Sequence, residues 1–332
     1  MKIPSFERIF EISGEEEFRS LALEIFRHQA RENPVYKKYV RMLGISPETV
    51  GSPAEIPFLP AGFFRDHRVL TGTGTPELVF KSSGTTSASP AKHYVIDPEL
   101  YRESYARGFE YFFGRPSGYR ILALLPSRPE RKDSSLVYMA AGLINLSRHS
   151  ESGFYLQNRG GLLEQILRLE DAEEQYLLLG LSFALADLAD ELLVKHPLKL
   201  EHGLIVETGG MKGRREEMTR EELHEKLKQG FGVSSVGSEY GMTELLSQAW
   251  SKGKGLFRCP PWMKIMIRDP YDPLSPQAME SSGGINIIDL ANIHSCSFLA
   301  TQDIGRLHPD GGFEVLGRFD NSDIRGCNLM AG

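Results

Sequence analysis

The sequence contains little cysteine and no long apolar stretch. Three cysteines, Cys259, Cys296 and Cys327, lie in the C-terminal quarter without the close pairs of a zinc site or disulfide framework, so we expect reduced thiols. The longest uncharged stretch, 134–147, is too short for a membrane span, which takes about 20 residues. The first ten residues include Lys2, Glu7 and Arg8 and lack the apolar core of a signal peptide. We therefore expect a cytoplasmic protein without a membrane span.

Runs of basic residues are also missing. The 332 residues include 38 Lys and Arg against 44 Asp and Glu, a net charge of −6, which argues against nucleic acid as the principal partner. With 41% hydrophobic residues the composition is that of a globular protein. At about 150 residues per domain, the length predicts two domains, or one large α/β domain with an appendage. Small-molecule chemistry is the favoured function.

Several common catalytic motifs do not occur. Gly72-Thr73-Gly74 is not a dinucleotide fingerprint, because Glu77 stands at the third glycine position. Gly180-Leu181-Ser182 is not the nucleophile elbow of a serine hydrolase, because Phe183-Ala184 follows. The histidines do not form a helical zinc motif. These spacings disfavour metal-dependent and serine hydrolysis.

The apolar periodicity predicts two helices in the first third of the chain. The first follows Ser13, with Glu16 completing a capping box, and ends before Pro34. The second starts at Asp97-Pro98, where the aspartate caps and the proline occupies the first turn. The apolar stripes are Phe18, Leu21, Ile25 and Phe26 in the first helix and Tyr101, Tyr105, Phe109 and Phe112 in the second.

Strands and helices alternate over the central region. The expected strands are 121–125, 176–181, 204–207 and 233–236, and the expected helices are 134–146, 182–195 and 219–229, the last with a Thr219–Glu222 capping box. This alternation predicts an α/β fold with a mostly parallel sheet covered by helices on both faces. Hairpin-connected strands are expected beyond residue 255, at 263–267, 284–290, 296–300 and 313–316.

A loop rich in hydroxyl side chains follows the apolar pair Val79-Phe80. Its hydroxyl and backbone N–H groups can surround phosphate oxygens, with Lys92 as a nearby positive charge. The order of a Walker A motif is absent. Ser/Thr-rich segments are more often solvated loops, and taken alone the segment favours that interpretation. The candidate phosphate-binding residues are Ser82, Ser83, Gly84, Thr85 and Thr86.

The segment 237–244 comes directly after the last predicted strand of the alternating region. Ligands bind beyond the carboxyl ends of strands in an open α/β sheet. There Tyr240 can stack on a base, Thr243 can bind a phosphate and Glu244 can hold Mg²⁺. The alternative is the start of a helix with a capping hydroxyl.

Two further motifs lie near the end of the chain. Asp303, within Thr301-Gln302-Asp303-Ile304-Gly305, can accept hydrogen bonds from both hydroxyls of a ribose. Arg318, after Gly317, can close over the same sugar or its phosphate. Each motif alone is also typical of a hairpin turn.

The order of these motifs resembles the adenylate-forming superfamily of acyl-CoA synthetases, adenylation domains and luciferases. The series runs from about residue 79 to the end and includes Gly209-Gly210 between the first two motifs. Within the superfamily the chain looks most similar to the LuxE-like acyl-protein synthetases, followed by the phenylacetate-CoA ligases. The short length and the segments 207–213 and 325–329 support this branch.

The resemblance implies an ATP-dependent ligase that activates a carboxylic acid, which in this branch is a fatty acid, as acyl-AMP and passes the acyl group to a thiol. It implies mostly parallel, helix-flanked sheets in a core of residues 1–254, a β-rich subdomain at 255–318 that completes the nucleotide site, and a tail at 319–332. ATP and Mg²⁺ would be the cofactors, with Glu244 at the metal. The nucleotide would contact the Ser82–Thr86 loop, Gly209, Gly210, Glu239, Tyr240, Gly241, Thr243, Asp303 and Arg318.

The chain also departs from the superfamily pattern. Twelve residues follow Asp320, so we expect the mobile C-terminal domain and its catalytic lysine to be absent. Lys92, Lys212 or Arg325 could replace that lysine, or a partner could supply the charge. A chain that does not catalyse adenylation would be a non-catalytic nucleotide- or acyl-binding protein. Ser87 also replaces the glycine that usually follows the threonine pair.

The sequence is compatible with more than one acceptor for the acyl group. In LuxE-like proteins a cysteine near the C-terminus accepts the acyl group on the way to a reductase, and Cys327 is the matching residue. Arg325 would lower the pKa of its thiol. The alternatives are free CoA as the acceptor, with Cys327 incidental, or a small apolar residue without a role.

Overall fold

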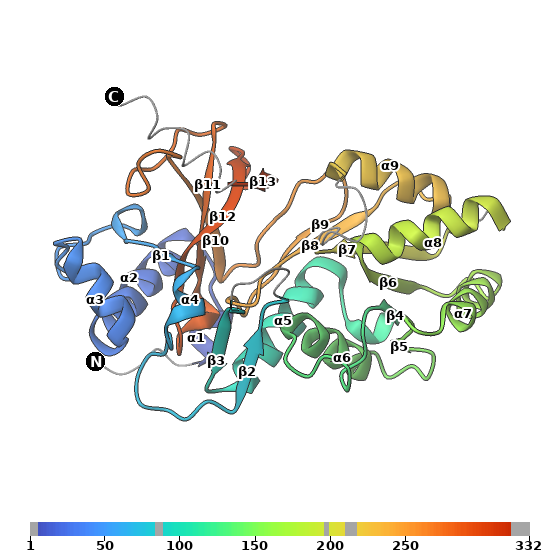
Figure 1. The fold of residues 1–332 in the computed structure, drawn as a ribbon, viewed down its shortest axis with the longest axis horizontal. Coiled ribbons are helices and arrows are strands. Elements are labelled where there is room, and N and C mark those ends of the chain that lie inside the picture. The colour runs from blue at the N-terminus through green and yellow to red at the C-terminus, as the bar shows by residue number, and fades with distance from the viewer. Residues whose placement is uncertain (1–5, 84–88, 196–198, 210–217, 320–332) are drawn as a thin grey trace. The chain divides into compact units, whose positions relative to one another are not determined.

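We describe residues 6–83, 89–195, 199–209 and 218–319 of a computed structural model. The chain divides into two compact units (Figure 1). One combines Met1–Thr73 with Pro261–Gly332, and the other is Gly74–Pro260. Each unit is described by itself.

The unit Gly74–Pro260 is built on a six-stranded sheet in the order β5-β4-β6-β7-β8-β9. The first five strands in this order are parallel to one another, and β9 is antiparallel to β8. The sheet confirms the predicted mostly parallel arrangement. Its strands are β4 (Arg120–Leu124), β5 (Gly153–Phe154), β6 (Tyr176–Leu181), β7 (Gly203–Thr208), β8 (Gly237–Tyr240) and β9 (Ala249–Ser251).

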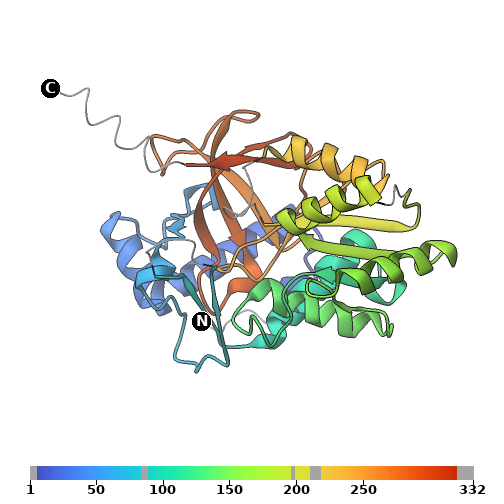
Figure 2. The same cartoon turned by 45° about the vertical axis from the view of Figure 1, so that its right-hand side comes forward.

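Helices cover both faces of this sheet. Helices α8 and α9 pack together on one face, and α5 and α6 lie on the other (Figures 1 and 2). Asp97 caps α5 and Thr219 forms the predicted capping box with Glu222 at α9. The helices are α5 (Pro98–Phe113), α6 (Ser135–Ser147), α7 (Arg159–Asp171), α8 (Ser182–Lys195) and α9 (Arg220–Phe231), with a 3-10 turn η2 (Pro116–Gly118).

A separate two-stranded hairpin carries the ends of the Ser/Thr-rich loop. Strand β2 (Leu78–Lys81) pairs antiparallel with β3 (Lys92–Val95). Side chains directly opposite each other on such strands share a face. Phe80 and His93 form one opposite pair, and both are buried. Phe80 packs on Tyr101 of α5, which anchors the hairpin to the helical layer.

The unit of Met1–Thr73 and Pro261–Gly332 contains a five-stranded sheet. Its order is β1-β12-β11-β10, with β13 also paired to β12. Only the β1–β12 pairing is parallel among the described pairs of this sheet. The strands are β1 (Leu59–Pro60), β10 (Met263–Arg268), β11 (Ser282–Asp289), β12 (Phe298–Leu307) and β13 (Phe313–Arg318). The helices are α1 (Phe6–Phe10), α2 (Glu15–Glu32), α3 (Pro34–Met42) and α4 (Phe63–Asp66), with 3-10 turns η1 (Pro53–Glu55) and η3 (Leu290–Asn292).

The core of this unit is aromatic and is fixed by a buried amide. Phe298 contacts the rings of Phe26 and Tyr36 at centroid distances of 5.9 and 6.2 Å. Gln29, which is fully buried, donates to the carbonyls of Asn292 and Ile293. Because a buried amide is costly without partners, these bonds define how α2 packs beside β11 and β12.

Two local predictions were wrong. Gly14, not Ser13, is the N-cap of α2, and the Ser13 hydroxyl donates to Glu17 rather than pairing with Glu16. Helix α2 ends at Glu32, before Pro34 as predicted, and Asn33 caps the next helix, α3. The fourth central strand covers Gly237–Tyr240 instead of 233–236, so the 237–244 motif begins within the strand and not after it. In the described part of the chain, no helix has the length and apolarity to cross a membrane.

Candidate functional site

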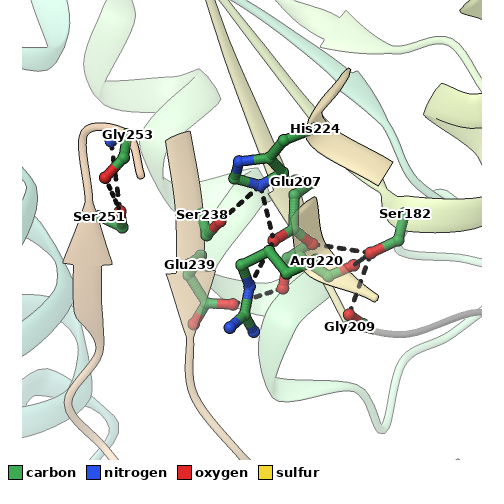
Figure 3. Close-up of polar contacts among 10 residues, drawn as sticks. Ser182, Glu207, Gly209, Arg220, His224, Ser238, Glu239, Ser251 and Gly253 are labelled. Atoms are coloured by element: carbon green, nitrogen blue, oxygen red, sulfur yellow. Dashed lines mark hydrogen bonds and ion pairs between the residues drawn. The ribbon is translucent and has the colours of Figure 1, made fainter. Parts of the chain in front are cut away.

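The carboxyl ends of β6, β7 and β8 carry a group of polar side chains. Ser182 is the first residue of α8, directly after β6. Its hydroxyl donates to Glu207 Oε2 at 2.7 Å and lies 3.0 Å from the carbonyl oxygen of Gly209 (Figure 3). Ser182 thereby ties the end of β6 to the end of β7. Ligands bind at this edge in open α/β sheets.

Glu207 is a buried carboxylate surrounded by hydrogen-bond donors. Its Oε1 lies 3.6 Å from Arg220 Nε and 3.6 Å from His224 Nε2 (Figure 3). Burial raises the pKa of Glu207, but hydrogen bonds from His224 and Ser238 and the charge of Arg220 outweigh it, and the net pKa is lowered. Glu207 is therefore ionised at neutral pH and anchors the start of α9 to β7.

Ser238, His224 and Glu207 contain the residue types of a hydrolytic triad, but their geometry excludes that role. A triad uses the two ring nitrogens of histidine for different partners. Here His224 Nε2 faces both Ser238 Oγ, at 3.2 Å, and Glu207. Ser238 is also fully buried, so a substrate does not reach it. The group is a structural network beneath the sheet edge.

A second carboxyl group lies beside this network. Glu239 is opposite Thr208 in the β7–β8 ladder, and the Thr208 hydroxyl donates to Glu239 Oε2. Burial raises the pKa of Glu239 to about 7, the Thr208 hydrogen bond acts against this, and the charge of Glu207 adds to it. The edge thus holds one ionised carboxylate and one that titrates near neutral pH. Sequence reasoning predicted Glu239 but missed Glu207 and Thr208.

A tight turn follows β8. Leu245 N–H donates to the carbonyl of Met242 at 3.1 Å, which makes Thr243 and Glu244 the central residues of the turn. His93 Nδ1 lies 2.9 Å from the carbonyl oxygen of Thr243. The predicted phosphate and metal residues therefore share one turn, and the alternative of a helix start is wrong, because no helix begins there.

The neighbouring residues of this turn differ in exposure. Tyr240 is 9% exposed and meets the ring of Phe257 at 5.9 Å, in an edge-on contact. Gly241 is exposed, and an added Cβ would lie 2.5 Å from Glu239 Oε1. Glu244 is 7% exposed. Among the residues that the structure describes, no cluster of three or more His, Cys, Asp or Glu side chains could hold a metal by itself.

The base of the Ser/Thr-rich loop is closed by Ser82. Its backbone N–H donates to the carbonyl of Ala91 at 3.0 Å, and its hydroxyl accepts from Ala91 N–H at 2.9 Å. Ser83 is exposed, and Lys92 is an exposed residue of β3 opposite Lys81. The rest of the predicted cradle, together with several other candidates, lies outside the described residues: Gly84, Thr85, Thr86, Ser87, Gly210, Lys212, Arg325 and Cys327.

The other unit brings two predicted ribose-binding residues together. Asp303 of β12 and Arg318 of β13 are opposite each other in the ladder, and Arg318 Nε lies 3.0 Å from Asp303 Oδ1. The Asp303 side chain is 15% exposed and that of Arg318 is 69% exposed. The two motifs, separate in sequence, therefore form one pair on adjacent strands.

The fold is shared with solved ligase structures. A structure titled 2-hydroxyisobutyryl-CoA ligase in complex with 2-HIB-AMP and CoA matches with a TM-score of 0.66 and 14% identity, over 98% of this chain and 75% of that one. ATP-bound MatB from Rhodopseudomonas palustris matches with a TM-score of 0.52 and 17% identity, over 74% of this chain. The chain covers 49% of the length of MatB.

The sequence itself has no comparable match. No protein-family model matches it, and no curated protein does. At 13 to 17% identity the structural likeness establishes the architecture, in which mixed and parallel sheets carry helices on their faces. The chain has the fold of adenylate-forming acyl-CoA ligases.

Proposed function

We propose that this protein uses ATP to activate a carboxylic acid as acyl-AMP and transfers the acyl group to a thiol. The observation that carries the proposal is the turn after β8, where Thr243 and Glu244 stand together at the carboxyl edge of a parallel sheet. The 2-hydroxyisobutyryl-CoA ligase that shares the fold was solved with an acyl adenylate and CoA.

The chemistry follows from the weakness of a carboxylate as an acyl donor. A carboxylate oxygen attacks the α-phosphorus of ATP, the bond to the bridging oxygen of pyrophosphate breaks, and acyl-AMP remains. The thiolate of the acceptor then attacks the carbonyl carbon, and AMP leaves with the oxygen that joined it to the acyl group. Donors aimed at the α-phosphate stabilise the charge that builds up in the first step.

The roles of the chain's residues follow the predicted motifs. The Thr243 hydroxyl donates to the α-phosphate, and Lys92, with the loop from Ser82 to Thr86, compensates the charge of the β- and γ-phosphates. Residues 255–318 complete the nucleotide site through Asp303 and Arg318 at the ribose. The base lies against Gly209, Gly210, Glu239, Tyr240 and Gly241.

Glu244 is the residue that would hold Mg²⁺. Magnesium sites that include nucleotide phosphates use one or two protein carboxylates, so a single carboxylate in the turn matches this donor set. The ion would neutralise charge on the transferring phosphate. Thr243, the neighbouring residue in the same turn, acts on the phosphate through its hydroxyl.

For the acceptor we propose Cys327 as in LuxE-like acyl-protein synthetases, with a fatty acid as substrate and an acyl reductase as partner. Free CoA is the alternative, and the CoA complex of the 2-hydroxyisobutyryl-CoA ligase supports it. A Cys327→Ser variant separates the two. Loss of a protein thioester with intact adenylation supports Cys327, and unchanged acyl-CoA formation supports CoA.

The test is hydroxylamine-trapped adenylation over a panel of acids, with intact-mass detection of a thioester. Acid-dependent release of pyrophosphate supports the proposal. Binding of ATP without turnover of any acid supports a non-catalytic nucleotide-binding protein instead. Absence of both contradicts the proposed enzymatic function.

A further inference from the structure

His93 lies one residue beyond Lys92, but on the opposite face of β3. Successive side chains of a strand point to opposite faces. Lys92 is exposed, whereas His93 is 1% exposed. His93 is thus a buried polar side chain on the hairpin that closes the Ser/Thr-rich loop, and neither composition nor motif spacing assigns it a role.

The partner of His93 is far away in the sequence. Its Nδ1 lies 2.9 Å from the carbonyl oxygen of Thr243, 150 positions further along the chain. A carbonyl oxygen only accepts, so Nδ1 must carry a hydrogen in the neutral ring as well as in the charged one. The bond therefore runs from the imidazole to the backbone of the turn.

This contact holds the Thr243 turn from outside. Within the turn, Leu245 N–H donates to the Met242 carbonyl. Thr243 is a central residue of this turn, and the hydrogen bond that closes a tight turn does not use the carbonyl of a central residue. The hydrogen bond from His93 satisfies it and fixes the peptide plane between Thr243 and Glu244.

We propose that His93 is a positioning residue for adenylation, which holds the Thr243 hydroxyl and the Glu244 carboxylate in place from strand β3. The inference rests on the proposed function. His93 lies in β3, and Ser82, directly after β2, pairs with Ala91 at the base of the same hairpin, so the bond links the Thr243 turn to this hairpin.

A purely structural role would give a different outcome. A buried histidine that only fills space can be replaced by an apolar side chain of similar size with no selective effect on turnover. A positioning histidine needs a donor at the place of Nδ1. Misplacement of catalytic groups by about 1 Å can reduce turnover by about 100-fold.

Asparagine and glutamine provide the matched comparison. The amide nitrogen of asparagine takes the position of Nδ1 in histidine, whereas the amide nitrogen of glutamine takes that of Nε2. His93→Asn therefore preserves the donor to Thr243, and His93→Gln presents a donor of the same kind elsewhere. His93→Leu removes it.

The experiment measures acid-dependent ATP–pyrophosphate exchange for the wild type and the three variants, with kcat and the KM for ATP determined separately. Thermal unfolding accompanies each variant. We expect kcat to fall by about 10- to 100-fold in His93→Leu and His93→Gln. In His93→Asn it should return to within about threefold of the wild type.

The outcomes separate this inference from the function on which it rests. An active wild type with unchanged kcat in His93→Leu overturns the role of His93 alone. So does a His93→Asn variant no more active than His93→Gln at equal thermal stability, a comparison that holds even where His93→Leu does not fold. A wild type inactive with every acid overturns the inference and the proposed function together.

Discussion

The hydroxyl of Thr208 donates to the carboxyl group of Glu239 across the β7–β8 ladder, beside the ionised Glu207. Two carboxyl groups on neighbouring strands thus have different protonation behaviour. Hydrogen bonds and a nearby arginine hold one ionised, and burial with a like charge nearby raises the pKa of the other.

The raised pKa of Glu239 predicts a loss of stability as the pH rises. In the unfolded chain the carboxyl titrates near 4.5, and in the folded chain near 7. Between these values the folded state holds more protons than the unfolded one, so stability is full below the lower pKa and declines up to the higher one.

Glu239→Gln removes this titration. We expect the variant to match the wild type at pH 4 and to exceed it by about 1–3 kcal/mol in free energy of unfolding at pH 8, because the buried charge is gone. Urea unfolding over this pH range measures the difference. A wild-type advantage that grows with pH contradicts the assigned pKa direction.

Glu207→Gln should destabilise the fold at neutral pH. The variant leaves Arg220 and His224 without their charged acceptor in a buried position, at a cost of about 2–4 kcal/mol. Glu225→Gln is the control on the same helix, because its pair with Lys228 is exposed and should change stability by less than about 0.5 kcal/mol. Equal urea midpoints for the two variants would refute the structural role of Glu207.

Replacing Asp303 tests the ribose contact. The Arg318 side chain is largely exposed, so its ion pair adds little to stability, and Asp303→Asn should leave thermal unfolding within a few degrees of the wild type. Loss of a charged acceptor should weaken ATP binding by about tenfold in calorimetry. Glu314→Gln, which alters another ion pair of the β12–β13 ladder, should bind ATP as the wild type does. Equal affinities for both variants would rule out the ribose assignment.

Lys92 and Lys81 offer a second matched pair. Both are exposed and lie opposite each other on β2 and β3, and Lys81 Nζ lies 3.9 Å from Asp133. If Lys92 compensates phosphate charge, Lys92→Gln should lower kcat for adenylation by about 100-fold, while Lys81→Gln stays within about threefold. Steady-state pyrophosphate release measures both. Similar rates for the two variants would place the required cation elsewhere.

The sequence predicted the parts of the fold that depend on local chemistry. Asp97 and Thr219 cap helices as expected, because a capping side chain needs only the next few residues. The prediction placed the fourth strand at 233–236 because the true strand, Gly237–Tyr240, has an untypical composition. Gly237 and Ser238 carry no apolar pattern, but an added Cβ at Gly237 would lie 2.8 Å from the Ser251 carbonyl oxygen, so close strand packing requires the glycine.

The candidate site could be predicted only in part. Motif order identified Thr243, Glu244, Asp303 and Arg318 as candidates, and strand register explains why the last two meet. His93 was missed because its partner lies 150 positions away and no local pattern indicates such a contact. Glu207 was missed for the same reason, since its donors come from α8, α9 and β8.

The central claim is that a carboxylate oxygen attacks the α-phosphorus of ATP. The most direct measurement supplies a substrate acid labelled with ¹⁸O in its carboxylate and follows the label by mass spectrometry after complete thioester formation. The account predicts one ¹⁸O in AMP and none in pyrophosphate. Unlabelled AMP, or ADP with labelled phosphate, would contradict it.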